Sequence, residues 1–158
     1  MAIKYINGIP NVPEAVGPYS QAVIHGNNIY LSGQIALHPE LGEIVSANIE
    51  DETEQVMKNI IAALGFLNID FTYVLKTTIY LTDMNDFNKV NQIYSKWMGQ
   101  VRPARITVGV NSLPKNANVE IQMDAVLELD DVLIIPHGTN EAIDEIGIES
   151  YQAKDNSK

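Results

Sequence analysis

Residues 102–129, RPARITVGVNSLPKNANVEIQMDAVLEL, carry the pattern that organises the rest of the chain. From position 119 onward, apolar side chains alternate with mostly polar ones, which is typical of a β-strand with one face in a core and one face open. The sequence therefore predicts a half-buried strand with the Glu120 carboxylate on its open face. The expected core-facing set is Val119, Ile121, Met123, Ala125 and Leu127, and the opposite set is Glu120, Gln122, Asp124, Val126 and Glu128.

Arginine occurs only at positions 102 and 105, at the start of this stretch, and the other eight fixed positive charges are lysines. A guanidinium group can hold a carboxylate or phosphate through two parallel hydrogen bonds, whereas an ammonium group acts as a point charge. An arginine that anchors an anionic substrate and a glutamate that handles water or a proton form a candidate hydrolytic pair. A surface salt bridge is the alternative interpretation of the same residue types.

Composition and charge limit the classes of protein to consider. The 158 residues include 46% hydrophobic residues, enough for one compact domain, and no cysteine, which excludes disulfide scaffolds and thiolate metal sites. A net charge of -10 repels polyphosphates, so we do not expect a nucleic acid as a partner. The N-terminus lacks a signal-peptide or transit-peptide pattern, and no apolar run reaches membrane-spanning length. We therefore expect a cytoplasmic protein without a membrane partner.

The periodicity of apolar residues predicts a single α+β domain over residues 1–129, with two helices on one face of one mixed sheet. Residues 1–14 are expected to form a loose segment, because glycine and proline interrupt it. The expected order is then a β-hairpin over 19–35, a helix over 51–67, a strand over 73–81, a helix ending at Met98, a strand over 106–110 and the alternating strand.

Two positions within the expected strands bear on the site. Gly33 lies in the second strand of the hairpin, where glycine weakens pairing unless a bulge or the close approach of another group requires it. Both interpretations stay open at this point. Ile106, which follows Arg105, is expected to point into the core if its strand alternates.

The sheet face opposite the two helices is expected to be mixed in character. A sheet half-covered by helices, with aromatic and apolar residues on its open side, often completes its burial against copies of itself. We therefore expect a homo-oligomer with a site in a cleft between subunits, where the polar sheet residues converge. The residues expected on this open face include Lys76, Thr78, Tyr80, Glu120, Gln122, Asp124 and Val126.

Several collinear motifs from Val12 to Leu129 resemble those of the YjgF/Rid family, the reactive intermediate deaminases, also known under the older name of L-PSP endoribonucleases. Their order and spacing match the family closely, which makes the resemblance more specific than a single short motif. The motifs are Gly17-Pro-Tyr-Ser-Gln21, Ser32-Gly-Gln-Ile35, Lys76-Thr-Thr, Asn85-Asp-Phe with Val90-Asn91, Pro103-Ala-Arg105, Leu113-Pro-Lys115 and Val119-Glu-Ile121.

The resemblance implies a chorismate-mutase-like subunit that forms a homotrimer with sites in the clefts between subunits. It also implies hydrolysis of 2-imino acids, the tautomers of enamines released by pyridoxal-phosphate dehydratases, to 2-keto acids and ammonia. In this interpretation Arg105 anchors the carboxylate, Glu120 positions water and Tyr19 lines the site. Gly33 and Thr107 complete the pocket, and Asn91 lies near the cleft.

The residues read on their own agree with this chemistry. A guanidinium fork would fix the substrate carboxylate and aim the C=N carbon at a water held by Glu120. A hydroxyl such as that of Tyr19 or Thr107 could hydrogen-bond the developing amine. We expect no metal and no cofactor, since the iminium carbon is already electrophilic. The histidines at positions 25, 38 and 137 have no metal-ligand spacing and are expected to be surface or structural residues.

Two other functions remain open. A non-enzymatic carboxylate-binding or chaperone-like module would use the same arginine without turnover. An endoribonuclease is suggested by the older family name but opposed by the negative charge and by the lack of a basic and aromatic surface. Residues 130–158 extend beyond the usual end of such domains. We expect this extension to pack in part on the domain or a neighbouring subunit, with 153–158 disordered.

Overall fold

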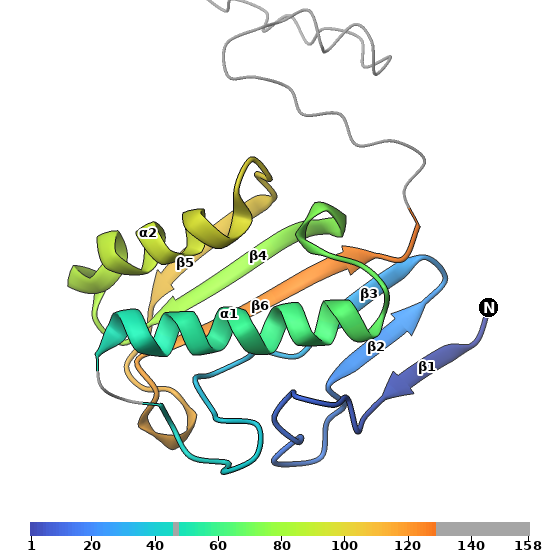
Figure 1. Cartoon of the computed structure of the whole chain (residues 1–158), viewed down its shortest axis with the longest axis horizontal. Helices are drawn as coiled ribbons and strands as arrows, with labels where there is room; N and C mark the ends of the chain where they lie inside the picture. Colours follow the sequence, from blue (N-terminus) through green and yellow to red (C-terminus); the bar gives the residue numbers. More distant parts are fainter. Residues whose placement is uncertain (46–47, 129–158) are drawn as a thin grey trace, which may run out of the picture.

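The computed structural model describes residues 1–45 and 48–128, and within this part of the chain two helices cover one face of a six-stranded sheet (Figure 1). The predicted α+β class, with one mixed sheet and both helices on one face, is confirmed. The strands are β1 (Ile3–Ile6), β2 (Ala22–His25), β3 (Asn28–Leu31), β4 (Val74–Leu81), β5 (Ala104–Gly109) and β6 (Val119–Val126), and the helices are α1 (Ile49–Phe66) and α2 (Phe87–Met98).

The strand order is β1-β2-β3-β6-β4-β5. All neighbouring pairs are antiparallel except β4 and β5, which are parallel and are connected through α2. The alternating strand β6 therefore lies in the middle of the sheet, between the hairpin and β4. Its odd-numbered residues from Val119 to Ala125 are fully buried, as the alternation predicts.

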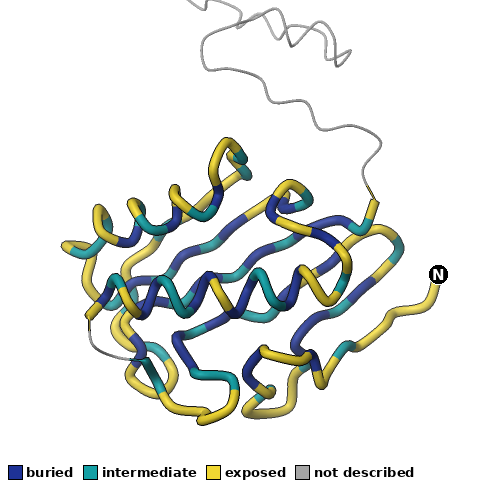
Figure 2. Tube along the Cα trace, viewed as in Figure 1, coloured by how far each residue is buried: buried dark blue, intermediate teal, exposed yellow. Residues whose placement is uncertain are grey.

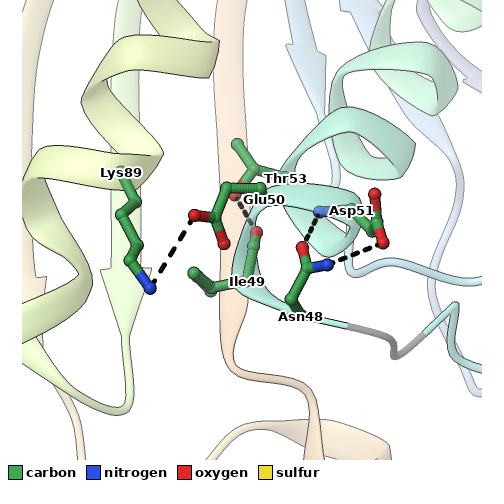
Figure 3. Close-up of polar contacts among 6 residues, drawn as sticks. All are labelled: Asn48, Ile49, Glu50, Asp51, Thr53 and Lys89. Atoms are coloured by element: carbon green, nitrogen blue, oxygen red, sulfur yellow. Dashed lines mark hydrogen bonds and ion pairs between the residues drawn. The ribbon is translucent and has the colours of Figure 1, made fainter.

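Helix α1 begins where its sequence provides a cap and a run of acidic residues. The Asn48 Oδ1 accepts a hydrogen bond from the Asp51 backbone N–H at 2.8 Å, and the Asn48 Nδ2 donates to the Asp51 carboxylate at 2.9 Å (Figure 3). Acidic side chains in the first turn also favour the positive end of the helix dipole. Glu50 extends toward α2 and forms an ion pair with Lys89 at 3.7 Å, which links the two helices.

The hydrophobic core lies between α1 and the central strands. Figure 2 shows the buried residues along the inner side of α1 and along β4 and β6. Val56, Ile60 and Leu64 recur on one face of the helix and are almost completely buried, as the helical spacing predicts. Just after the end of α1, Asn68 adopts the left-handed conformation at a φ of 58°, which asparagine tolerates well.

The hairpin prediction is confirmed, but the prediction of a loose N-terminal segment is wrong in part. Strands β2 and β3 are joined by the two-residue turn Gly26-Asn27, with Gly26 at a φ of 61°. Strand β1 pairs with β2 at the edge of the sheet, and three of its four residues are exposed. Because β1 is held by backbone hydrogen bonds at an edge and buries little side-chain surface, its sequence lacks the alternation that would reveal it.

The assignment of residues 1–129 to a single domain stays a prediction. The expectations for the extension over 130–158 lie outside the described residues. None of the helices within residues 1–45 and 48–128 has the length and apolar character needed to cross a bilayer.

Candidate functional site

The open face of the sheet brings together the polar residues that the sequence places there. Glu120 is opposite Tyr80, Gln122 is opposite Thr78, and Asp124 is opposite Lys76 across the β4–β6 pair. Residues directly opposite each other in a ladder point to the same side of the sheet. The predicted convergence of these side chains on the face away from the helices is therefore confirmed.

Glu120 lines a cavity of about 350 Å³ at one end of this face. Its side chain is half-buried, and burial raises the pKa of the carboxyl group above its ordinary value. No hydrogen bond holds the Glu120 carboxylate among the described residues, so it is available to a water or a ligand. The other residues lining the cavity that matter below are Tyr19, Gln21, Gly33 and Lys115.

Gly33 is a glycine because the Glu120 carboxylate occupies the space of a side chain. A Cβ built on Gly33 would lie 2.0 Å from the Glu120 Oε1 and 2.9 Å from its Cδ. Strand β3 ends at Leu31, so Gly33 lies beyond the strand in which it was expected. The next residue, Gln34, exchanges two backbone hydrogen bonds with Ile121, at 2.9 and 3.0 Å, which holds this segment against β6. Of the two interpretations left open for Gly33, the close approach of another group, here the Glu120 carboxylate, is correct.

The wall of the cavity is held by a buried glutamine of the Gly17–Gln21 motif. The Gln21 Oε1 accepts a hydrogen bond from the Ile9 backbone N–H at 2.9 Å, and its Nε2 donates to the Pro13 carbonyl at 2.8 Å. Gln21 is only 3% exposed, so these bonds are shielded from water. Tyr19 lines the same cavity, and its hydroxyl oxygen accepts a hydrogen bond from the Val16 backbone N–H at 3.1 Å.

Arg105 lies on the other side of the sheet, next to α2. In the β4–β5 pair Arg105 is opposite Thr77, whose hydroxyl accepts a hydrogen bond from the Tyr94 hydroxyl at 3.1 Å. The Arg105 Nη1 donates to the Asn91 Oδ1 at 2.8 Å, and the guanidinium carbon is 5.1 Å from the centre of the Tyr94 ring. The helix therefore orients the guanidinium through an amide and an aromatic face.

The prediction that Ile106 points into the core is wrong. Ile106 is opposite Thr78 on the open face of the sheet and is 49% exposed. The alternation of β5 is as expected, but its phase is the reverse of the one assumed, because Arg105 and Thr107 take the helix side. The Thr107 Oγ1 is buried and has no hydrogen-bond partner among the described residues.

The salt-bridge interpretation of Arg105 finds no support in the described part of the chain. Neither Arg102 nor Arg105 has a carboxylate oxygen within 4.0 Å there, and the ion pairs present link lysines of α2 to glutamates of α1. Both arginines line a second cavity of about 430 Å³ together with Asn91, Tyr94 and Ser95.

Apart from Thr107, which lines neither cavity, the predicted site residues thus fall into two sets. Glu120, Tyr19 and Gly33 share the cavity on the open face, whereas Arg105 and Asn91 share the cavity beside α2. Within one subunit the proposed anchor and the proposed water-binding carboxylate lie on opposite faces of the sheet, so a small substrate cannot contact both. The arrangement is consistent with two halves of a site that meet only when copies of the chain associate.

Comparison with known proteins gives the family. The family model described as Endoribonuclease L-PSP matches residues 9–127. The chain belongs to the L-PSP (YjgF/Rid) family. A RutC family protein of Pyrococcus horikoshii is 45% identical over 118 residues, which cover 75% of this chain and 94% of the relative. The 2-iminobutanoate/2-iminopropanoate deaminase of Homo sapiens is 42% identical over 124 residues, 78% of this chain and 90% of the relative. A solved structure from Thermotoga maritima has a TM-score of 0.76 at 42% identity and covers 80% of this chain and 98% of its own.

In this L-PSP family member, sequence reasoning missed Glu52. Its side chain is 1% exposed, and its carboxylate accepts hydrogen bonds from the Asn118 backbone N–H at 2.9 Å and from the Asn118 Nδ2 at 2.6 Å. The bonds tie α1 to the residue just before β6 and so fix the strand that carries Glu120. Glu52 lies four residues before Val56, which places it on the core face of α1. This spacing is the sequence signal that could have identified a buried carboxylate.

A second missed residue is Lys115, which lines the Glu120 cavity from a strained turn. Its φ of 55° is in the left-handed region, and its Nζ donates a hydrogen bond to the Gly42 carbonyl at 2.9 Å. Pro114 and Lys115 of the Leu113-Pro-Lys115 motif line this cavity. Lys115 therefore brings a positive charge to the lining of this cavity, in a chain whose net charge is negative.

The histidines of the described residues lie outside both cavities. His25 is exposed at the end of β2, and the His38 Nδ1 accepts hydrogen bonds from the Glu40 and Leu41 backbone N–H groups, at 3.3 and 3.4 Å. His137 lies outside the described residues. In the part of the chain that the structure describes, no three histidine, aspartate or glutamate side chains are grouped so as to hold a metal ion.

Proposed function

We propose that this L-PSP family protein hydrolyses 2-imino acids, such as 2-iminobutanoate and 2-iminopropanoate, to 2-keto acids and ammonia. The observation that carries the proposal is the Arg105 guanidinium, oriented by Asn91 and Tyr94 and without a carboxylate partner in the described residues. Such a group binds a small carboxylate in a fixed orientation. The name of the human relative, a 2-iminobutanoate/2-iminopropanoate deaminase, supports the same reaction.

We propose that the active site forms between subunits of a homotrimer. One subunit supplies Arg105 and Asn91, and its neighbour supplies Glu120, Tyr19 and Gly33. Two features support this arrangement: the two sets line separate cavities in one chain, and the open sheet face exposes large apolar side chains. Among these, Tyr30 and Ile106 are each 49% exposed, and Val108 is 37% exposed.

The reaction follows from the roles that these side chains can take. Arg105 holds the substrate carboxylate and aims the C=N carbon toward a water bound by Glu120. As the water oxygen bonds to this carbon, the Glu120 carboxylate accepts a proton and the imine nitrogen takes up another. The resulting carbinolamine then loses ammonia and leaves the keto acid. The Tyr19 hydroxyl, whose oxygen accepts from the Val16 N–H, can donate its own proton to the nitrogen.

A coupled assay tests the proposed reaction. Threonine dehydratase generates 2-iminobutanoate in place, semicarbazide traps the free imine, and the release of 2-oxobutanoate is followed with and without the protein. Faster keto acid release in its presence supports deamination. Binding of 2-oxobutanoate without any acceleration would instead support the non-enzymatic carboxylate-binding module. Steeply salt-dependent RNA binding and cleavage by the purified protein would support the endoribonuclease.

We expect Gly33→Ala to lower kcat/KM for 2-iminobutanoate on the order of a hundredfold, since the new Cβ displaces the Glu120 carboxylate. The thermal midpoint should not fall, because the group displaced is the flexible end of a side chain and Gly33 does not have a positive φ. The assay above and thermal unfolding measure the two effects.

Gly65→Ala is the matched control for this substitution. Gly65 lies within α1, and a Cβ there meets no atom within 4 Å. This variant should be at least as stable as the wild type, by up to about 1 kcal/mol, and fully active. Full activity of the Gly33 variant would show that the position of the Glu120 carboxylate does not matter for turnover.

The pH dependence should report on Glu120. Because burial raises its pKa, the carboxylate that acts as the base is lost at a higher pH than for an exposed glutamate. As pH falls through this raised pKa, kcat/KM should fall, and Glu120→Gln should have low activity without this acid limb. The folded chain also binds the proton more tightly than the unfolded chain, so the Glu120 contribution to stability decreases as pH rises through the same window. An acid limb that persists in the variant would assign the base to another group.

A further inference from the structure

The cavity beside α2 contains more positive charge than one substrate carboxylate requires. Its lining includes both arginines of the chain, while the whole protein has a net charge of -10. Neither guanidinium has a carboxylate within 4.0 Å among the described residues. Two unmatched guanidinium groups in one concave site favour a ligand with two negative charges.

The Arg102 guanidinium is held in place by hydrogen bonds to the backbone. Its Nη1 donates to the Gly99 carbonyl at 2.5 Å and to the Val101 carbonyl at 2.8 Å, so one edge of the guanidinium is fixed at the C-terminal end of α2. The remaining nitrogen donors have no hydrogen-bond partner in the described part of the chain. A guanidinium that is held on one edge and open on the other is prepared to bind an anion.

Both arginines act on the same aromatic side chain. Burial raises the pKa of the Tyr94 hydroxyl, while the Thr77 hydrogen bond and the charges of Arg105 and Arg102 oppose that shift. Both positive charges therefore lower the pKa of the same hydroxyl group, that of Tyr94, which lines the cavity with them. The cavity volume of about 430 Å³ leaves room for a ligand larger than a four-carbon monocarboxylate.

We propose that Arg102 binds a second carboxylate, so that the site prefers 2-imino dicarboxylic acids over 2-imino monocarboxylic acids. This proposal rests on the proposed deaminase function for its substrate chemistry. Arg105 holds the carboxylate next to the imine carbon, and Arg102 holds the distal carboxylate. For 2-iminosuccinate, water adds across the C=N bond and ammonia leaves, which gives oxaloacetate with no other reactant.

The test compares the selectivity of the wild type and three variants. The ratio of kcat/KM for 2-iminosuccinate, made in place from aspartate by a flavin-dependent aspartate oxidase, to that for 2-iminobutanoate is measured for each. Arg102→Gln should lower this ratio about fivefold, the effect of losing one exposed charged contact. Arg102→Lys, which keeps the charge, should restore part of it. Lys58→Gln removes an exposed charge on α1, outside the cavity lining, and should leave the ratio unchanged.

A binding measurement separates failure of this proposal from failure of the deaminase function. Calorimetric titration compares 2-oxoglutarate with 2-oxobutanoate on the wild type and on Arg102→Gln, with thermal unfolding to verify the fold. Tighter binding of the dicarboxylate by the wild type, reduced about fivefold in the variant, supports the second site even if neither imine is hydrolysed. Equal binding of both acids by the wild type, or an equal loss for both in the variant, overturns the proposal.

Discussion

Replacing Arg105 with alanine is expected to lower kcat/KM for 2-iminobutanoate by about a hundred- to a thousandfold, the cost of removing a charged partner from a substrate carboxylate. The guanidinium supplies both charge and orientation, because Asn91 accepts a hydrogen bond from one nitrogen and Tyr94 lies under the group. Without it, the carboxylate is unpaired and the C=N carbon is no longer aimed at the water. The coupled dehydratase assay measures the effect.

A surface lysine provides the control for charge alone. Lys89 also lies on the α2 side of the molecule, and its ion pair with Glu50, at 3.7 Å, is exposed. Lys89→Ala should change kcat/KM by less than about twofold, since exposed ion pairs contribute little. If the Arg105 variant folds, associates like the wild type and keeps its activity, the carboxylate is bound elsewhere and the proposed anchor is wrong.

The elements that depend on local physics could be predicted from the sequence. The alternation around Glu120, the Gly26-Asn27 turn and the helical spacing of Val56 and Ile60 each fix the type of an element without reference to distant residues. Strand β1 could not be found in this way. Its stability comes from backbone pairing with β2, which is separated from it in the sequence, and its exposed side chains carry no periodic signal.

The sequence indicates candidate site residues, but not their relative positions. Arg105, Ile106 and Thr107 alternate whichever face each one takes, and the choice is made by the register with β4 and by the packing of α2. An apolar residue such as Ile106 suggests a core position, yet it lies on the open face, where association would bury it. Gly33 is a similar case, because its requirement comes from Glu120, a residue distant in the sequence.

Mixing two inactive variants should restore activity if the site forms between subunits. Arg105→Ala keeps Glu120, and Glu120→Gln keeps Arg105, so a mixed assembly can pair an intact guanidinium with an intact carboxylate. When equal amounts are dissociated and reassociated at random, about one quarter of the interfaces contain both groups. We therefore expect about a quarter of the wild-type activity per subunit from two proteins that are each nearly inactive.

The double variant with both substitutions provides the matched control. Mixed with Arg105→Ala, it forms the same kind of assembly but contributes no intact Arg105, so activity should stay at background. Recovery in the first mixture alone shows that the guanidinium of one chain acts with the carboxylate of another. Subunit exchange is verified by mass spectrometry of the assemblies. If exchange is complete and the first mixture stays inactive, the two groups do not act across an interface. Because they lie on opposite faces of the sheet within one chain, they would then serve separate sites.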